Sequence, residues 1–144
     1  MNNIALPDLP SQLILLALKD LKAVEASPEY QVDMCIWHET FVDFAEEITT
    51  CHVCFAGAVM AGTLESEFTD LSPDDFNPEV EGKLVALDHF RSGDLTQGIE
   101  AMNLEVPRAL NNSISWPTRL YAVDPDQFKL DMKSHAKLLE RHGL

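Results

Sequence analysis

The chain has 144 residues, with 24 Asp and Glu against 10 Lys and Arg, which gives a formal net charge of −14 at pH 7. This length allows one domain with a buried core, and 46% hydrophobic residues are typical of a globular protein. No apolar run reaches the roughly 18 residues of a membrane-spanning helix, and the first residues, MNNIALPDLP, lack the features of a signal peptide. We therefore expect one cytoplasmic domain over residues 1–144.

The acidic residues are concentrated in the middle of the chain. Between Glu25 and Glu105 there are eighteen acidic residues and two basic ones, Lys83 and Arg91, a balance of −16. A field of this sign repels nucleic-acid phosphates and attracts basic protein surfaces. The charge therefore argues against direct nucleic-acid binding. It predicts either a solvated surface that keeps the protein soluble or an acidic face that docks on a basic partner.

The first predicted helix follows Ser11, a candidate N-cap, and ends at Ser27-Pro28. Its apolar residues recur at three-to-four spacing: Leu13, Leu16, Ala17, Leu21 and Val24. Apolar and polar residues then alternate from Tyr30 to Ile36, which fits either a short strand or an extended loop.

Helical spacing returns between Glu39 and Ile48, and a further helix is predicted from Cys51 to about Glu65 with Thr50 as its cap. Ser72-Pro73 and Asn77-Pro78 are helix-start signatures, and the oxygen-rich residues 70–77 are interpreted as helix capping because they lack calcium-loop spacing. The helix after Pro78 can close at Gly93.

Asp94 can cap the next helix, which is predicted to reach Leu104, and residues 105–124 are expected to form an ordered loop. The last helix has Asp124 as cap, Pro125 in its first position and Gly143 just past its end. One face of this helix carries an apolar row: Phe128, Met132, His135 and Leu139. Another face carries a basic row: Lys129, Lys133, Lys137 and Arg141. We expect the apolar row to be buried and the basic row to be exposed, available to an acidic region of this chain or of a second copy.

Only one segment has strand periodicity. The sequence therefore predicts a mainly α fold, a domain of about five or six helices with at most one short β-hairpin.

The stretch TTCHVCFAGAVMAGTL (residues 49–64) is the strongest candidate site. With Cys51 and Cys54 in the first turn of a helix, they would share a face with Ala58 and Ala61. Glycines inside a helix cost up to ~1 kcal/mol each relative to alanine, so Gly57 and Gly62 suggest that another segment approaches closely. The first interpretation is thus a packed helix in which the cysteines act as small hydrophobes.

Three chemical alternatives remain open for the same residues. Zinc needs four ligands, and Cys51 and Cys54 supply two, with His38 and Cys35 as the nearest additions. A redox dithiol would need a preceding strand, whereas FAEEITT looks helical. A nucleophilic cysteine would need a base, for which His38 is the best candidate. Because none of these sets is complete, we expect no catalytic residue, cofactor or metal here, and zinc remains the alternative.

Two ordered pieces carry a resemblance to a known group of proteins. The segments VDMCIWH (32–38) and CHVCFAGAVMA (51–61) resemble a pattern in small proteins of tailed bacteriophages and prophages. In that pattern an Asp-Met-x-x-Trp segment precedes a cysteine-rich, alanine-glycine helix start. The resemblance implies a phage or prophage origin and contact between Trp37 and the helix, with the indole over its Ala-Gly surface. It transfers no activity to Cys51 or Cys54.

Together these observations predict a small acidic phage-type protein that acts by binding a basic host or viral protein, as an inhibitor or a nucleic-acid mimic. The rival prediction is a thiol- or zinc-dependent enzyme centred on Cys51, Cys54 and His38. A homodimer is a third prediction, with the basic last helix meeting an acidic neighbour.

Overall fold

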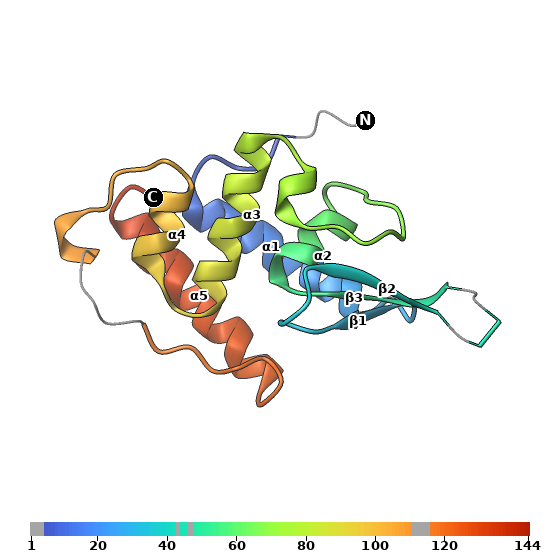
Figure 1. The fold of residues 1–144 in the computed structure, drawn as a ribbon. Helices are drawn as coiled ribbons and strands as arrows, with labels where there is room; N and C mark the ends of the chain where they lie inside the picture. Colours follow the sequence, from blue (N-terminus) through green and yellow to red (C-terminus); the bar gives the residue numbers. More distant parts are fainter. Residues whose placement is uncertain (1–4, 43, 46–47, 111–115) are drawn as a thin grey trace.

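The computed structural model describes residues 5–42, 44–45, 48–110 and 116–144, and within these residues the chain forms five α-helices and three β-strands. The helices are α1 (Pro10–Glu25), α2 (Phe55–Ala61), α3 (Pro78–Arg91), α4 (Leu95–Ala101) and α5 (Pro125–Arg141). The strands are β1 (Tyr30–Val32), β2 (His38–Val42) and β3 (Ile48–Val53). The helices gather at one end of the molecule and the strands extend from the other (Figure 1).

The predicted mainly α fold is wrong, because the strands form a mixed sheet in the order β1-β3-β2. The central strand β3 pairs in parallel with β1 and antiparallel with β2, with an irregularity between Phe41 and Val42. The sequence of β3 is ITTCHV, in which four of six residues are β-branched. Such side chains fit a pleated surface and restrict χ1 in a helix, and this propensity decided the local structure.

Two predicted helices are corrected by this sheet. The helical spacing between Glu39 and Ile48 falls instead on β2 and the start of β3. The helix predicted from Cys51 to Glu65 is shorter and begins later, as α2, so Thr50 and Cys51 are strand residues and Cys54 is the N-cap. The alternation after Tyr30 gives a strand of three residues, and no described helix lies between Val32 and Phe55.

Helix α1 is the centre of the core and contacts β1, α2, α3 and α5. Its predicted apolar row is confirmed as a buried face that includes Leu13, Ala17, Leu21 and Val24. Ser11 is not the cap, because the helix already begins at Pro10; its hydroxyl donates to the Leu144 carbonyl at 2.7 Å. This bond fastens the start of α1 to the residues that follow α5.

The predicted boundaries of the later helices are mostly confirmed. Asn77, Asp94 and Asp124 each cap a helix by accepting from a backbone N–H. Gly93 follows α3 with φ +83, in the left-handed region where glycine carries no steric penalty. Helix α4 ends at Ala101 rather than Leu104. In the described part of the chain, no helix is both long enough and apolar enough to cross a membrane.

The apolar row of α5 is buried as predicted, at Phe128, Met132, His135 and Leu139. The basic row is largely exposed, but Lys129 turns toward α1 and donates to Glu25 at 2.6 Å. The Tyr121 hydroxyl donates to the other Glu25 oxygen. The expectation that this row meets acidic groups is thus confirmed within the chain for Lys129.

Candidate functional site

Cys54 opens helix α2 where the backbone of Trp37 crosses it. The Cys54 sulfur accepts from the Gly57 N–H at 3.4 Å, and the Cys54 N–H donates to the Trp37 carbonyl at 3.3 Å. A Cβ atom on Gly57 would lie 1.7 Å from that carbonyl oxygen. The predicted close approach to the glycine-containing helix is confirmed. This contact is made by the main-chain carbonyl of Trp37, and the expected packing of its indole on the Ala-Gly surface stays a prediction.

Cys51 and His38 meet across the sheet, as the nucleophile hypothesis required. Both are essentially enclosed, with 0% and 1% of their surfaces exposed. The Cys51 sulfur lies 3.6 Å from each ring nitrogen, so it is not aligned with the hydrogen-bonding direction of either one. His38 Nδ1 lies 2.7 Å from the Thr69 carbonyl and therefore donates its proton there.

Burial keeps both thiols protonated at neutral pH. It raises the pKa of Cys51 to about 11, with a smaller contribution from the negative charge of Asp70. Burial also raises the pKa of Cys54 to about 11, against an opposing effect of the backbone N–H groups at the start of α2. Since the thiolate is the nucleophile and the metal ligand, these surroundings disfavour both chemistries.

Cys35 lies apart from the pair. It is exposed, and its N–H donates to the Asp33 carboxylate in a turn between β1 and β2. Among the described residues, no three His, Cys, Asp or Glu side chains gather closely enough to hold a metal ion. The proposed fourfold set of Cys51, Cys54, His38 and Cys35 is therefore not assembled; only Cys51 and His38 are joined.

Two solvent-open hollows are lined by acidic residues, and His38 contributes to the lining of the first. The first has a volume of about 320 Å³ and is lined in part by Glu39, Asp70 and Asp75. The second, of about 380 Å³, is lined in part by Glu65, Glu67 and Asp75. We call these two the acidic hollows. They adjoin because Leu71 and Asp75 line both.

Hydrogen bonds to β2 hold the wall between the acidic hollows. The Leu71 N–H donates to the His38 carbonyl at 2.8 Å, and Asp70 accepts from the N–H and hydroxyl of Thr40. Asp75 accepts from the Ser72 N–H, which confirms the predicted capping role of this segment. The carboxylates of Asp70 and Asp75 are thus fixed before any ligand arrives, which lowers the entropy cost of binding.

The outer face of the sheet continues this surface. Glu39 is opposite His52 in the β2–β3 register and is exposed, whereas the neighbouring His38 is buried. On the same face the rings of Phe41 and His52 lie 4.1 Å apart. An aromatic pair beside the exposed Glu39 carboxylate suits the stem and head of a lysine or arginine side chain.

The sequence predicted an acidic field but not this site. Glu39 is about thirty residues away from Glu67 and Asp70 in the chain, and the pairing of residues 69–71 with β2 brings them together. The alternation of His38, Glu39, Thr40 and Phe41 was the available signal, since it places Glu39 and Phe41 on one face of a strand.

Comparison of the chain with models of protein families, with curated proteins and with solved structures yields no match.

Proposed function

We propose that this is a small acidic binding protein that acts without catalysis, by docking its acidic hollows on a basic surface of another protein. The observation that supports this proposal is the pair of adjoining acidic hollows. The acidic residues that line them are Glu39, Asp70, Asp75, Glu65 and Glu67. Electrostatic complementarity of this kind speeds association and excludes acidic competitors.

The two cations within residues 25–105 both lie away from the acidic hollows. Of the two cations between Glu25 and Glu105, Lys83 is buried and donates to the Leu6 carbonyl, Asp8 and Glu79. Arg91 pairs with Asp88 at 2.6 Å on α3. Neither lines the acidic hollows, so neither offsets the negative charge of Glu39, Asp70 and Glu67 there.

We propose further that the partner is a protein whose basic surface binds nucleic acid. A basic surface that accepts a row of carboxylates is commonly one that binds nucleic-acid phosphates, so the protein would act as a nucleic-acid mimic. The resemblance of residues 32–38 and 51–61 to phage proteins supports a host or viral partner in the cytoplasm. If so, DNA or RNA should compete with this protein for the partner it captures.

An arginine-rich peptide of about twelve residues tests the site directly. We expect it to bind the native protein and to weaken as salt rises, because exposed charge pairs are screened. Replacing Glu39 and Glu67 with glutamine (E39Q/E67Q) should reduce the affinity by about three- to tenfold, since each exposed ion pair contributes up to ~1 kcal/mol. Fluorescence anisotropy of the labelled peptide at several salt concentrations measures both effects.

The matched control removes the same charge elsewhere. Glu100 and Glu105 are exposed and lie in and after α4, away from the acidic hollows. The variant E100Q/E105Q changes net charge equally and should bind the peptide almost as the native protein does. Equal losses in both double variants would show that the peptide responds to overall charge alone, and would contradict a site at the hollows.

A further inference from the structure

A short segment between α2 and α3 crosses the face of the sheet that carries Cys51 (Figure 1). Tyr30, Cys51 and Thr40 are partners in the strand register, so their side chains form one row on that face. The ring of Phe68 lies 5.1 Å from the Tyr30 ring at one end of this row. At the other end, Asp70 accepts from the Thr40 N–H at 2.9 Å and from its hydroxyl at 3.1 Å. The segment therefore passes over Cys51, which lies in the middle of the row and is enclosed.

Contacts between this segment, residues 68–71, and His38 complete the cover over Cys51. We call the segment the strap. His38 Nδ1 donates to the Thr69 carbonyl at 2.7 Å, and the Leu71 N–H donates to the His38 carbonyl at 2.8 Å. The Cys51 sulfur lies 3.6 Å from Nε2 of the same ring. The strap thus covers a thiol and an imidazole that lie against each other.

The strap is held less firmly than the core. None of the residues 65–72 is buried, and Leu71 lines both acidic hollows, which are open to solvent. The backbone of the strap pairs with the sheet through an isolated bridge at Leu71. A segment with few buried contacts and exposed hydrogen bonds unfolds locally at a lower free energy than the core. Cys54 lies instead under Trp37 at the start of α2, so local unfolding of the strap exposes Cys51 and leaves Cys54 covered.

The chemistry of Cys51 and His38 differs between a closed and an open strap. When the strap is closed, burial raises the pKa of Cys51 to about 11. The bond to Thr69 fixes the His38 proton on Nδ1, which leaves the lone pair of Nε2 on the side of the thiol. Opening the strap admits water to the sulfur and so removes the main cause of the raised pKa. Nε2 can then take the proton from the sulfur, which produces the nucleophilic thiolate.

We propose that Cys51 is a redox-sensitive switch for the acidic hollows, which exchanges with a low-molecular-weight disulfide when the strap opens. The Cys51 thiolate attacks one sulfur of the disulfide, the bond between the two disulfide sulfurs breaks, and a new disulfide bond to Cys51 forms. The proton of Cys51 passes to His38 Nε2 and then to the departing thiolate, so one disulfide is consumed and one thiol is released. Cys51 is enclosed when the strap is closed, so the attached group holds the strap open.

An open strap takes the wall of the acidic hollows with it. Asp70 then leaves Thr40 and Leu71 leaves His38, so the carboxylate and the side chain that these bonds hold in place are released. The modified protein should therefore bind a basic partner more weakly than the reduced protein does. This consequence rests on the proposed function, whereas the exchange at Cys51 does not.

Exchange with bis(2-hydroxyethyl) disulfide, a small neutral reagent, tests the strap in the variant C35S. Mass spectrometry of the digested protein distinguishes Cys51 from Cys54. In folded C35S, Cys51 should be modified slowly, through local unfolding of the strap, and ahead of Cys54. Adding Phe68→Ala should speed the modification of Cys51 about tenfold, because it removes the ring contact with Tyr30 and favours opening.

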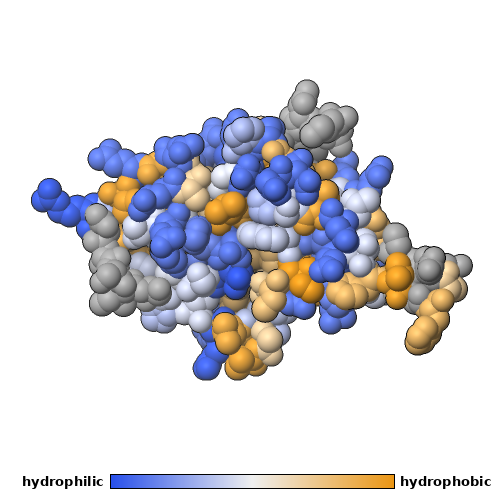
Figure 2. All heavy atoms as spheres, in the orientation of Figure 1, coloured by the Kyte–Doolittle hydropathy of each residue, from blue (hydrophilic) through white to orange (hydrophobic). Residues whose placement is uncertain are grey.

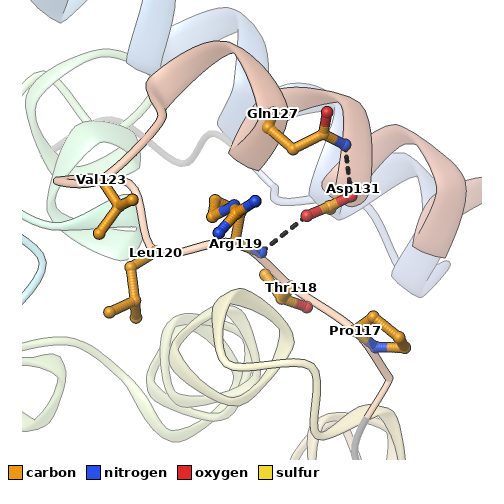
Figure 3. A pocket seen from close by; sticks show the side chains of 7 residues that line it. All are labelled: Pro117, Thr118, Arg119, Leu120, Val123, Gln127 and Asp131. Carbon is orange, nitrogen blue, oxygen red and sulfur yellow. Dashed lines mark hydrogen bonds between the residues drawn. The ribbon is translucent and has the colours of Figure 1, made fainter.

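The matched control for Phe68→Ala is Leu120→Ala, which also removes a large apolar side chain without a change in charge. Leu120 is 67% exposed and lies on the loop before α5, in the pocket that Figure 3 shows. Figure 2 shows apolar surface over this loop. Leu120→Ala should leave the rate at Cys51 unchanged.

Binding of the arginine-rich peptide tests the switch. C35S modified at Cys51 should bind the peptide at least threefold more weakly than reduced C35S, and dithiothreitol should restore the affinity. Equal affinity before and after modification would overturn the switch. Modification of Cys54 before Cys51, no acceleration by Phe68→Ala, or equal acceleration of both thiols would overturn the strap. If reduced C35S did not bind the peptide, the proposed function and its control by Cys51 would both be contradicted, whereas faster exchange in Phe68→Ala would still support the strap.

Discussion

Replacing Gly57 with alanine should lower the free energy of unfolding by about 3 kcal/mol, the largest loss that we expect from any single methyl group in this chain. The added Cβ would lie 1.7 Å from the Trp37 carbonyl oxygen and 2.9 Å from the Val53 side chain. The obstacle is backbone, which cannot rotate aside as a side chain can. Either α2 or the segment before β2 must therefore move, and the bond from the Cys54 N–H to Trp37 must lengthen. Urea unfolding followed by circular dichroism measures the loss.

Gly143→Ala is the matched control for this substitution. A Cβ at Gly143 meets no atom within 4 Å, so its only cost is the φ of +76, about 1 kcal/mol. If Gly57→Ala were no more destabilising than Gly143→Ala, the close approach of Trp37 to α2 would be contradicted. The description of Cys54 as an N-cap packed against the Trp37 carbonyl would then be contradicted as well.

Substituting Asp20 with leucine should cost about 2 kcal/mol, because it leaves two donors without their acceptor. Asp20 lies on α1 and is 7% exposed. Its carboxylate accepts from the Thr63 hydroxyl at 2.7 Å and from the Thr63 N–H at 3.2 Å, just after α2. Asp20→Asn is the matched variant, since its amide oxygen can still accept one of these bonds. It should keep more of the stability than leucine does.

Because Asp20 is buried, the difference in stability between the native chain and Asp20→Asn should depend on pH. Desolvation raises the pKa of Asp20 above 3.8 in the folded chain, and the two bonds from Thr63 oppose this only in part. The folded state therefore binds this proton more tightly than the unfolded state, and its contribution to stability is lost as pH rises from about 3.8 through the folded pKa. Asparagine does not ionise, so its stability relative to the native chain should improve over that window. An unchanged difference between pH 3.5 and pH 7 would contradict this assignment.

The helical part of the fold was predictable because its signals are local. Asn77-Pro78, Asp94 and Asp124-Pro125 set their helix starts through side chains that lie within three residues of the groups they bind. The sheet was not predictable in this way. Its strands are short, β1 pairs with β3 across twenty residues, and Phe41, Phe44 and Ile48 share a spacing that fits a helix equally well. Short apolar segments are ambiguous until a partner strand is known.

The candidate site likewise has a part that local sequence predicted and a part that depends on contacts between distant residues. The sequence correctly predicted that Gly57 marks a close approach. It named His38 as a partner of Cys51 only in the rival enzyme prediction, and it placed Cys51 on a helix rather than a strand. It did not predict that Asp70 and Leu71 would pair with β2 and form the wall between the acidic hollows. That wall depends on contacts between residues about thirty positions apart, for which the chain carries no local signal.

Thiol titration of the native protein tests the central claim most directly: that Cys51 and Cys54 are packed, protonated side chains rather than a catalytic or metal-binding centre. At pH 8, a chromogenic disulfide reagent should react quickly with one thiol, the exposed Cys35, and with the other two only after unfolding. The variant C35S should therefore show no fast reaction while folded. A fast-reacting thiol in folded C35S, or a zinc ion that co-purifies with it in a one-to-one ratio, would contradict the claim and favour an enzyme centred on Cys51 and His38.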